Sequence, residues 1–173
     1  MADEKQQPER TMTARVGRDN QRYGPNGERL VAGVVALSAD KTHVLLIQSS
    51  SSHTNPKKGW VLPKGGWESD EPTCSEAACR EAWEEAGIIC HVSRDLGEIT
   101  EKRTEAQIKK YGTSAPRALY RFFEVEVKEE RESWPERYKR GREWMGYLRA
   151  REALGARPEL LEALERSGIK KGC

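Results

Sequence analysis

The feature that most constrains this chain is the stretch REAWEEAG, which places Glu81, Glu84 and Glu85 within five consecutive positions. On an α-helix each residue turns by about 100°, so the three carboxylates share one face. Like charges at this spacing repel one another. Arg80 lies one helical turn before Glu84 and is placed to orient or partly neutralise that carboxylate. A helix with this face is either a solvated acidic helix or one that gathers cations.

The residues ahead of this helix favour the cation-binding alternative. Gly65 and Gly66 free the backbone just before the predicted helix, so that a carbonyl oxygen can turn toward the carboxylates. Carboxylates, a backbone carbonyl and water are the ligands that Mg²⁺ and Mn²⁺ prefer. Bound cations would relieve the repulsion between the glutamates and would also create a place for phosphate oxygens. The competing interpretation is a solvated helix with a single salt bridge.

The remaining pattern predicts a mixed order of strands and helices in an α/β (α+β) domain. Apolar, β-branched runs predict strands at residues 30–38, 43–49, 59–63, 88–92, 96–103 and 117–127. Two helices are predicted at residues 73–87 and 158–168, each with a proline near its start and a glycine at its end. No internal repeat and no linker divides the sequence. We therefore expect a single domain at residues 15–173, preceded by a flexible N-terminal tail at residues 1–14.

The charge of the chain argues against a general nucleic-acid binder. The formal net charge is only +2 over 173 residues, so bulk charge gives no reason to expect a stable nucleic-acid partner. Acidic clusters occupy residues 68–71, 81–85 and 124–132, and basic clusters occupy residues 15–29, 57–64, 103–121 and 137–149. Such alternation is either a solvated surface or the surroundings of a site that holds cations against a polyanion. The run RYKRGR could also be a nucleic-acid or nuclear-import patch.

The sequence shows no segment that would insert the chain into a membrane. No apolar run approaches the ~20 residues of a transmembrane helix, and the first residues lack the apolar core of a signal peptide. The four cysteines include no CxxC pair and no histidine partner at zinc-ligand spacing, so reduced thiols are expected. We therefore expect a monomer in the cytoplasm, with the nucleus as a second compartment and no membrane partner.

The acidic helix and the turn before it resemble the Nudix box, G-x5-E-x7-R-E-U-x-E-E-x-G-U, in which U is a bulky aliphatic residue. The matching positions are Gly65, Glu71, Arg80, Glu81, Glu84, Glu85, Gly87 and Ile88. Two features depart from this pattern. Eight residues instead of seven separate Glu71 from Arg80, and Ala82 fills an aliphatic position with a small side chain. The extra residue lies in the loop ahead of the helix, so it bears on Glu71 more than on the helical glutamates.

A longer resemblance spans nearly the whole chain after the first dozen residues. The segments TARVGRDNQRYGPNGERLVAGVVALSADK, WVLPKGGWESDEPT, REAWEEAG and RPELLEAL together resemble the fungal diphosphoinositol polyphosphate phosphohydrolases, which also hydrolyse diadenosine polyphosphates. The lengthened loop before Arg80 then marks this subgroup. The resemblance implies a Nudix fold, in which a mixed β-sheet is sandwiched between α-helices. It also implies a small polyanionic substrate: an inositol pyrophosphate, a diadenosine polyphosphate or inorganic polyphosphate.

The resemblance further implies roles for individual residues. Glu81, Glu85 and the carbonyl oxygen of Lys64 would bind Mg²⁺ or Mn²⁺, and Glu84 would be the catalytic glutamate that orients or deprotonates water. The cations would neutralise the charge of the phosphoanhydride and lower the pKa of bound water. The intact Arg80 and its neighbouring glutamates favour an active enzyme. Two alternatives stay open: a mainly nucleotide-directed hydrolase, such as a diadenosine polyphosphatase or an mRNA-decapping enzyme, and a polyanion-binding protein without turnover.

A highly phosphorylated substrate needs contacts beyond the metal ions, and arginine is suited to bidentate phosphate contacts. The positions that resemble the family's substrate contacts are Arg18, Arg29, Ser50, Ser51, Ser52, Arg117, Arg140 and Arg157. For the serine-rich segment, the competing interpretation is a flexible polar loop. For the arginines, the competing interpretation is a solvated basic surface.

Overall fold

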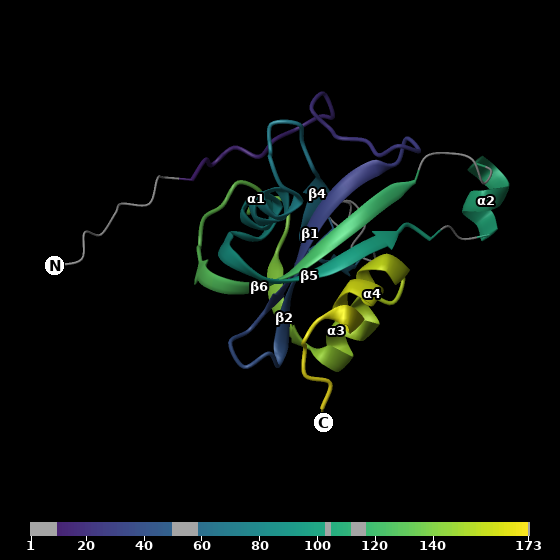
Figure 1. Ribbon diagram of the computed structural model, residues 1–173. Helices are drawn as coiled ribbons and strands as arrows, with labels where there is room; N and C mark the ends of the chain where they lie inside the picture. The colour runs from purple at the N-terminus through teal and green to yellow at the C-terminus, as the bar shows by residue number, and fades with distance from the viewer. Residues whose placement is uncertain (1–9, 50–58, 103–104, 112–116, 173) are drawn as a thin grey trace.

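A computed structural model describes residues 10–49, 59–102, 105–111 and 117–172, which form one mixed β-sheet with helices on both faces (Figure 1). The strands are β1 (Arg29–Leu37), β2 (His43–Gln48), β3 (Trp60–Val61), β4 (Lys64–Gly66), β5 (Ile88–Thr100), β6 (Ala118–Glu130) and β7 (Arg142–Gly146). The helices are α1 (Cys74–Ala86), α2 (Glu105–Tyr111), α3 (Tyr147–Ala153) and α4 (Pro158–Arg166). None of these described helices has the length and apolar character needed to cross a membrane.

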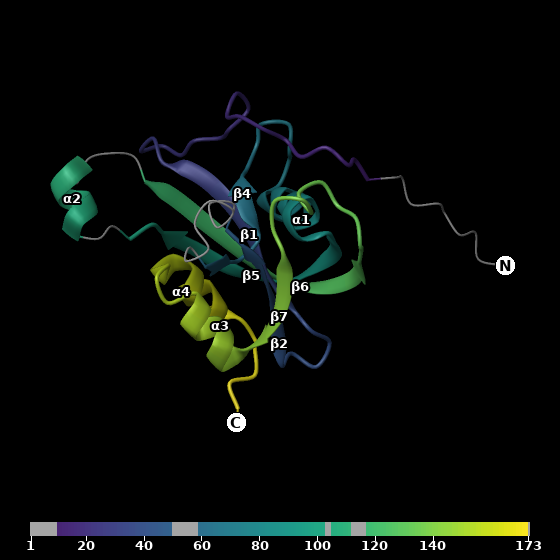
Figure 2. The same ribbon diagram turned by 180° about the vertical axis from the view of Figure 1, so that it is seen from behind.

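The sheet is built around β1. Its strand order is β3-β2-β1-β6-β5, with β4 paired to β1 and β7 paired to β2; Figure 2 shows β7 beside β2. β1 and β6 are parallel, in a register that runs from Arg29 opposite Ala118 to Leu37 opposite Glu126. The other pairs of described strands are antiparallel. The mixed sheet between helices that the sequence predicted is confirmed.

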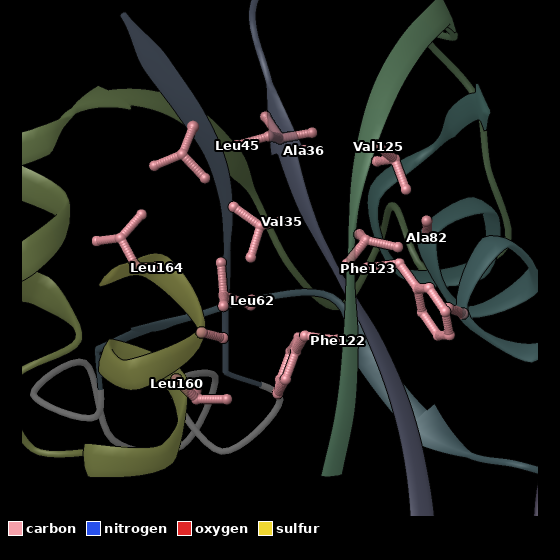
Figure 3. Close-up of a cluster of buried hydrophobic side chains, with 14 of the residues drawn as sticks. Val35, Ala36, Leu45, Leu62, Ala82, Phe122, Phe123, Val125, Leu160 and Leu164 are labelled. Carbon is pink, nitrogen blue, oxygen red and sulfur yellow. The ribbon is translucent and has the colours of Figure 1, made fainter. Parts of the chain in front are cut away.

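Apolar side chains fill the space on both sides of the sheet. Along β6, Phe122 lies on the side of Leu62 and of Leu160 from α4, whereas Phe123 lies on the side of Ala82 from α1 (Figure 3). All five side chains are buried. A strand that is covered on both faces reads as a nearly continuous apolar run, which is the pattern of the neighbouring strand β1, RLVAGVVAL, whose residues 31–37 are all buried. Because both faces are packed, α1 is held in a fixed position against the sheet.

Both ends of α1 are capped. The side chain of Thr73 accepts a hydrogen bond from the N–H of Glu76, and the Glu76 carboxylate accepts one from the N–H of Thr73. This capping box satisfies N–H groups that the first turn leaves without helical partners. Gly87 ends the helix with a φ of 67°, and its N–H donates to the carbonyl oxygen of Trp83 at 3.0 Å. The helix predicted at residues 73–87 is confirmed, with its caps as the predicted ends.

The second half of the chain departs from the sequence prediction. The strands expected at residues 88–92 and 96–103 are one strand, β5, whose pairing with β6 contains register shifts. These irregularities interrupt the alternation that would have identified one long strand. β4, β7, α2 and α3 are also not predicted by the sequence pattern. In β7, the sequence REWMG places two charged residues before two apolar ones, so it lacks the alternation of a half-buried strand.

The described part of the predicted tail, residues 10–14, lies against α1. Nε1 of Trp83 donates to the carbonyl oxygen of Thr11 at 2.9 Å. The guanidinium of Arg10 lies 6.0 Å from the centre of the Trp83 ring, within the range of a cation–π contact. The boundary between the tail and the domain stays a prediction, since residues 1–9 lie outside the described residues.

Candidate functional site

A cavity of about 230 Å³ opens beside the acidic face of α1. Most of its lining residues are charged or polar, and they come from the N-terminal segment, β1, β4, the loop after β4, α1, β6 and the segment between β6 and β7. The lining residues are Arg15, Gly17, Gln21, Arg29, Val31, Lys64, Gly65, Gly66, Glu68, Arg80, Glu81, Glu84, Glu85, Tyr120 and Glu136. All three glutamates that the sequence singled out are therefore brought to one cavity.

Arg80 joins the loop after β4 to the acidic face of α1. Its Nε and Nη2 donate to the two carboxylate oxygens of Glu71, both at 2.8 Å. Its Nη1 donates to Glu81 at 2.9 Å and to Glu84 at 3.0 Å. Nη2 also donates to the carbonyl oxygen of Gly66 at 2.9 Å. The planar fork of a guanidinium makes this set of contacts possible. In this structure Glu71 acts as the bidentate partner that orients Arg80.

Glu84 is held at both of its carboxylate oxygens. Oε1 accepts a hydrogen bond from the backbone N–H of Arg15 at 3.1 Å, and Oε2 accepts one from Arg80 at 3.0 Å. Glu84 is only 3% exposed to solvent. Burial raises the pKa of Glu84, although the bonds from Arg15 and Arg80 oppose that shift. The arrangement fixes the direction in which this carboxylate can accept a proton.

Glu81 and Glu85 form a buried pair whose negative charge is only partly compensated. Burial raises the pKa of Glu81 to about 8, with repulsion from Glu85 as the second cause. Burial also raises the pKa of Glu85 to about 7, against the attraction of Arg140 and Lys64. Glu85 accepts a hydrogen bond from the N–H of Lys64 at 3.0 Å and lies 3.6 Å from Arg140. Two buried carboxylates with raised pKa values are suited to a divalent cation.

The backbone at Gly65 approaches the carboxylate of Glu81 closely. A Cβ atom built on Gly65 would lie 2.2 Å from Oε1 and Cδ of Glu81, so a side chain at this position would displace the carboxylate. Gly65 pairs with Ala32 of β1, which fixes the backbone in the sheet. The glycine therefore lets β4 and α1 come together where oxygen ligands are needed. This close approach and the all-oxygen donor set fit Mg²⁺ or Mn²⁺.

A second group of carboxylates, from Glu68, Asp70 and Glu71, places its oxygens within 4.8 Å of one another. These carboxylates already have cationic partners. Arg15 donates to Glu68 at 2.7 Å and to Asp70 at 2.7 and 3.0 Å, while Arg80 holds Glu71. A cation there would have to displace two guanidinium groups. The buried pair on α1 is the better fit for a metal ion.

Lys64 and Arg29 also line the cavity, and further basic residues lie near Lys64. Burial is the main reason that the pKa of Lys64 is lowered, and Arg157, Arg29 and Arg140 lower it further, so all three lie within electrostatic reach. Burial and the charge of Arg18 likewise lower the pKa of Arg29. This density of positive charge favours a polyanionic ligand.

The predicted substrate residues differ in their surroundings. Nε of Arg29 donates to Gln21 at 2.9 Å, and the N–H of Arg29 donates to the carbonyl oxygen of Arg117 at 3.0 Å. Arg140 has a side chain only 9% exposed, and its guanidinium lies 3.1 Å from Glu136 and 3.6 Å from Glu85. Arg140 therefore faces these carboxylates, and it is not among the residues that line the cavity. Ser50, Ser51 and Ser52 lie outside the described residues.

Several lining residues are not predicted from the sequence: Arg15, Gln21, Glu68, Tyr120 and Glu136. Arg15 donates its backbone N–H to Glu84, far away in the sequence. Nearly every residue has a backbone N–H, so the residue type cannot predict such a contact. Tyr120 belongs to an apolar strand run and reads as a core residue. Glu68 belongs to an acidic cluster that has a solvated surface as its ordinary interpretation.

Comparison with known proteins agrees with the geometry. The family described as NUDIX domain matches residues 27–166. Nudix hydrolase 18, mitochondrial, of Arabidopsis thaliana is 38% identical over 151 residues, which cover 82% of this chain and 77% of that protein. The C. elegans Ap4A hydrolase binary complex has a TM-score of 0.57 at 19% identity, over 79% of this chain and 93% of that chain. The NUDIX hydrolase from Nitrosomonas europaea has a TM-score of 0.61 at 16% identity, over 80% of this chain and 87% of that chain.

The buried pair on α1 predicts a pH-dependent effect of Glu85→Gln on the metal-free protein. Because the folded-state pKa of Glu85 is raised, its proton-linked stability is fully present below the unfolded value of 4.5 and is lost as the pH rises through about 7. Gln carries no charge and escapes this loss. We expect the variant to be more stable than wild type by on the order of 2 kcal/mol at about pH 8, and nearly equal at about pH 5.

Urea unfolding in the presence of a chelator measures this difference at both pH values. Glu126→Gln, at an exposed position of β6, is the matched control and should show no such pH-dependent gain. An effect of Glu85→Gln that is the same at both pH values would contradict a buried carboxylate pair with uncompensated charge.

Proposed function

Because the chain belongs to the Nudix hydrolase family, we propose that it hydrolyses a phosphoanhydride bond of a small polyphosphorylated molecule, with Mg²⁺ or Mn²⁺ as cofactor. One observation carries the proposal. Glu84 is fixed at both oxygens beside the buried pair of Glu81 and Glu85, in a cavity that Lys64 and Arg29 also line. Carboxylates that can hold a metal ion and cationic side chains that can contact phosphate thus line one space, as a metal-bound polyphosphate requires.

We assign the metal ligands to Glu81, Glu85 and the carbonyl oxygen of Lys64. When bound, a divalent cation supplies neutralisation of the phosphate charge and a lowered pKa of its bound water. The support for the two glutamates is that they lie buried side by side on α1, where burial raises the pKa of both and a bound cation would offset the cost of their charged forms. Gly65 supports the backbone contribution, since it brings β4 against the Glu81 carboxylate.

Glu84 is the proposed base that orients the attacking water and accepts its proton. A carboxylate with a raised pKa is a stronger base than an exposed one, and burial raises the pKa of Glu84. The bond from Arg15 to Oε1 and the bond from Arg80 to Oε2 prevent the carboxylate from rotating. Arg80 and Glu71 thus orient the base through Arg80's bond to Glu84, without contacting the substrate in this proposal.

The proposed substrates are inositol pyrophosphates first, and then diadenosine polyphosphates and inorganic polyphosphate. The resemblance along the chain supports this order, and so does the number of cations at the cavity. Lys64 and Arg29 line it, with Arg18 and Arg157 within electrostatic reach of one or the other. Arg117, Arg140 and the serines at residues 50–52 complete the proposed substrate contacts. Phosphate groups fit these walls, because most of the lining side chains are charged or polar.

Direct turnover separates this proposal from its alternatives. The purified protein is incubated with Mg²⁺ and, separately, with an inositol pyrophosphate, diadenosine hexaphosphate, linear polyphosphate and capped RNA, and kcat/KM is compared. A clear preference for diadenosine hexaphosphate or capped RNA would favour a nucleotide-directed hydrolase. Binding of all four without turnover would favour a polyanion-binding protein.

The compartment is part of the proposal as well. We infer a monomer in the cytoplasm and the nucleus from the sequence alone, whereas the Arabidopsis relative is named as mitochondrial. Fluorescence of the tagged full chain in cells, compared with organelle markers, distinguishes these compartments.

Activity should disappear in the presence of a chelator and return with Mg²⁺ or Mn²⁺. The reason is that the proposed ligands are all oxygen atoms, which prefer hard divalent cations. The measurement is phosphate release before and after dialysis, with Ca²⁺ added in place of Mg²⁺ as a test of ligand geometry. Full turnover in chelator would remove the metal from the mechanism.

Glu84→Gln should lower kcat by roughly 10²–10⁴-fold, the usual contribution of a positioned acid or base. KM should change little, since Glu84 acts on water and not on the phosphates. The protein should stay folded with a modestly lower melting temperature, because Gln keeps the shape and can accept the bond from Arg15 but not also the bond from Arg80.

Glu76→Gln is the matched control on the same helix, because Gln can also complete the capping box of α1. It should leave both kcat and the melting temperature unchanged. A Glu84→Gln enzyme with wild-type kcat would show that the base lies elsewhere, with Glu81 and Glu85 as the next residues to test.

Arg29→Ala should raise KM for a highly phosphorylated inositol more than KM for a small nucleoside diphosphate. A charged contact to phosphate contributes on the order of 1.5–3 kcal/mol, and the larger polyanion makes more such contacts. Arg131→Ala removes an exposed arginine that pairs with Glu129 and serves as the control. Equal effects of Arg29→Ala on both substrates would argue against an inositol-phosphate site.

A further inference from the structure

The segment of residues 10–18, here called the N-terminal strap, runs beside α1 and the loop that precedes it (Figure 1). It is attached at several points. Nε1 of Trp83 in α1 donates to the carbonyl oxygen of Thr11. The N–H of Gln21 donates to the carbonyl oxygen of Arg18 at 3.1 Å, which closes a turn at the end of the strap. The N–H of Ser69 in the loop donates to the carbonyl oxygen of Asn20 at 2.7 Å. The strap therefore lies against the site and not away from it.

Arg15 is the strap residue that reaches the acidic face. Its backbone N–H donates to Oε1 of Glu84, and its guanidinium donates to Glu68 and Asp70. Asp70 is mostly exposed, whereas Glu68 and Glu84 are buried. One residue thus contacts the proposed base through its main chain and the neighbouring loop through its side chain.

We propose that Arg15 is a positioning residue for Glu84, an inference that rests on the proposed role of Glu84 as the base. The guanidinium anchors the strap to the loop, and the anchored main chain presents an N–H to Oε1. Arg80 binds only Oε2, so without Arg15 the carboxylate could turn about its last side-chain bond. Misplacing a reacting group by about 1 Å can cost roughly a hundredfold in rate.

Two other roles for Arg15 are separable from this one. Arg15 lines the cavity, so its guanidinium could contact a substrate phosphate. In that case its loss would act on KM. It could also serve only to hold the strap in place, and then its loss would change stability without a specific effect on kcat. Positioning predicts a loss of kcat at nearly constant KM.

Amide hydrogen exchange tests the contact without any enzymatic activity. In the wild-type full chain, the Arg15 N–H should exchange at least about tenfold more slowly than in an unprotected peptide. Glu84→Ala removes its acceptor, and Asp70→Ala removes one anchor of the guanidinium. Both variants should speed the exchange of peptides that contain the Arg15 amide. Glu76→Gln, which lies outside the contact and can keep the capping box of α1, should not.

Exchange in β1 reports whether each variant is folded. The exposed position of Asp70 makes its alanine variant a test that does not depend on the buried Glu84. Unchanged protection of the Arg15 amide in both folded variants would overturn the proposal, and so would a wild-type amide without protection.

Kinetics then measure the consequence for the reaction, with whichever phosphoanhydride substrate the wild type turns over. Arg15→Ala should lower kcat by roughly tenfold to a hundredfold, as expected for the loss of a charge-assisted contact. KM should stay within about twofold. Arg15→Lys keeps a cation for Glu68 and Asp70 and should recover part of kcat. Val16→Ala changes the next, exposed side chain and should have no effect.

The outcomes separate this proposal from the proposed function. A rise in KM at wild-type kcat would make Arg15 a substrate contact, and no kinetic change would make it a structural anchor; either result overturns the positioning role. If wild type hydrolyses none of the substrates, the proposed function fails, while hydrogen exchange still decides whether Arg15 holds Glu84.

Discussion

The guanidinium of Arg80 is the interaction on which the rest of the site depends. It binds both oxygens of Glu71, one oxygen each of Glu81 and Glu84, and the carbonyl oxygen of Gly66. A lysine could not replace it. A single ammonium lacks the planar set of donors with which Arg80 binds both oxygens of Glu71 and, at the same time, the glutamates of α1. The extra residue in the loop does not separate Glu71 from this network. The Arg80 side chain therefore links the lengthened loop to α1.

Arg80 does not compensate the whole acidic face. The carboxylates of the loop are paired with guanidinium groups at 2.7 or 2.8 Å, whereas Glu85 meets Arg140 only at 3.6 Å. Burial, and for Glu81 also repulsion from Glu85, therefore still disfavours the charged forms of these two carboxylates in the metal-free chain. Proteins accept such local conflicts mainly at functional sites. In this molecule the conflict lies on the face of α1 that borders the cavity.

The sequence predicts α1 with its caps and also most of β1, β2, β6 and α4, because these elements carry regular periodicity or clear end residues. It also predicts that Glu81, Glu84 and Glu85 share one face, since helical geometry alone requires that. β7 and α3 lack such a pattern, and the register shifts of β5 hide its continuity. Arg15 could not be found in this way, because a main-chain N–H donor has no residue type and its partner lies far along the chain.

The parallel pairing of β1 with β6 also determines when the sheet can be completed during synthesis. β2 follows β1 directly, but β6 is made only after α1 and β5 have emerged. A growing chain therefore holds its apolar central strand with one edge unpaired for a long interval, and a closure between segments so distant in sequence is slow. An unpaired apolar edge is a point at which chains associate with one another. A nascent chain that pauses before β6 would thus depend on chaperones, although its acidic helix has already been made.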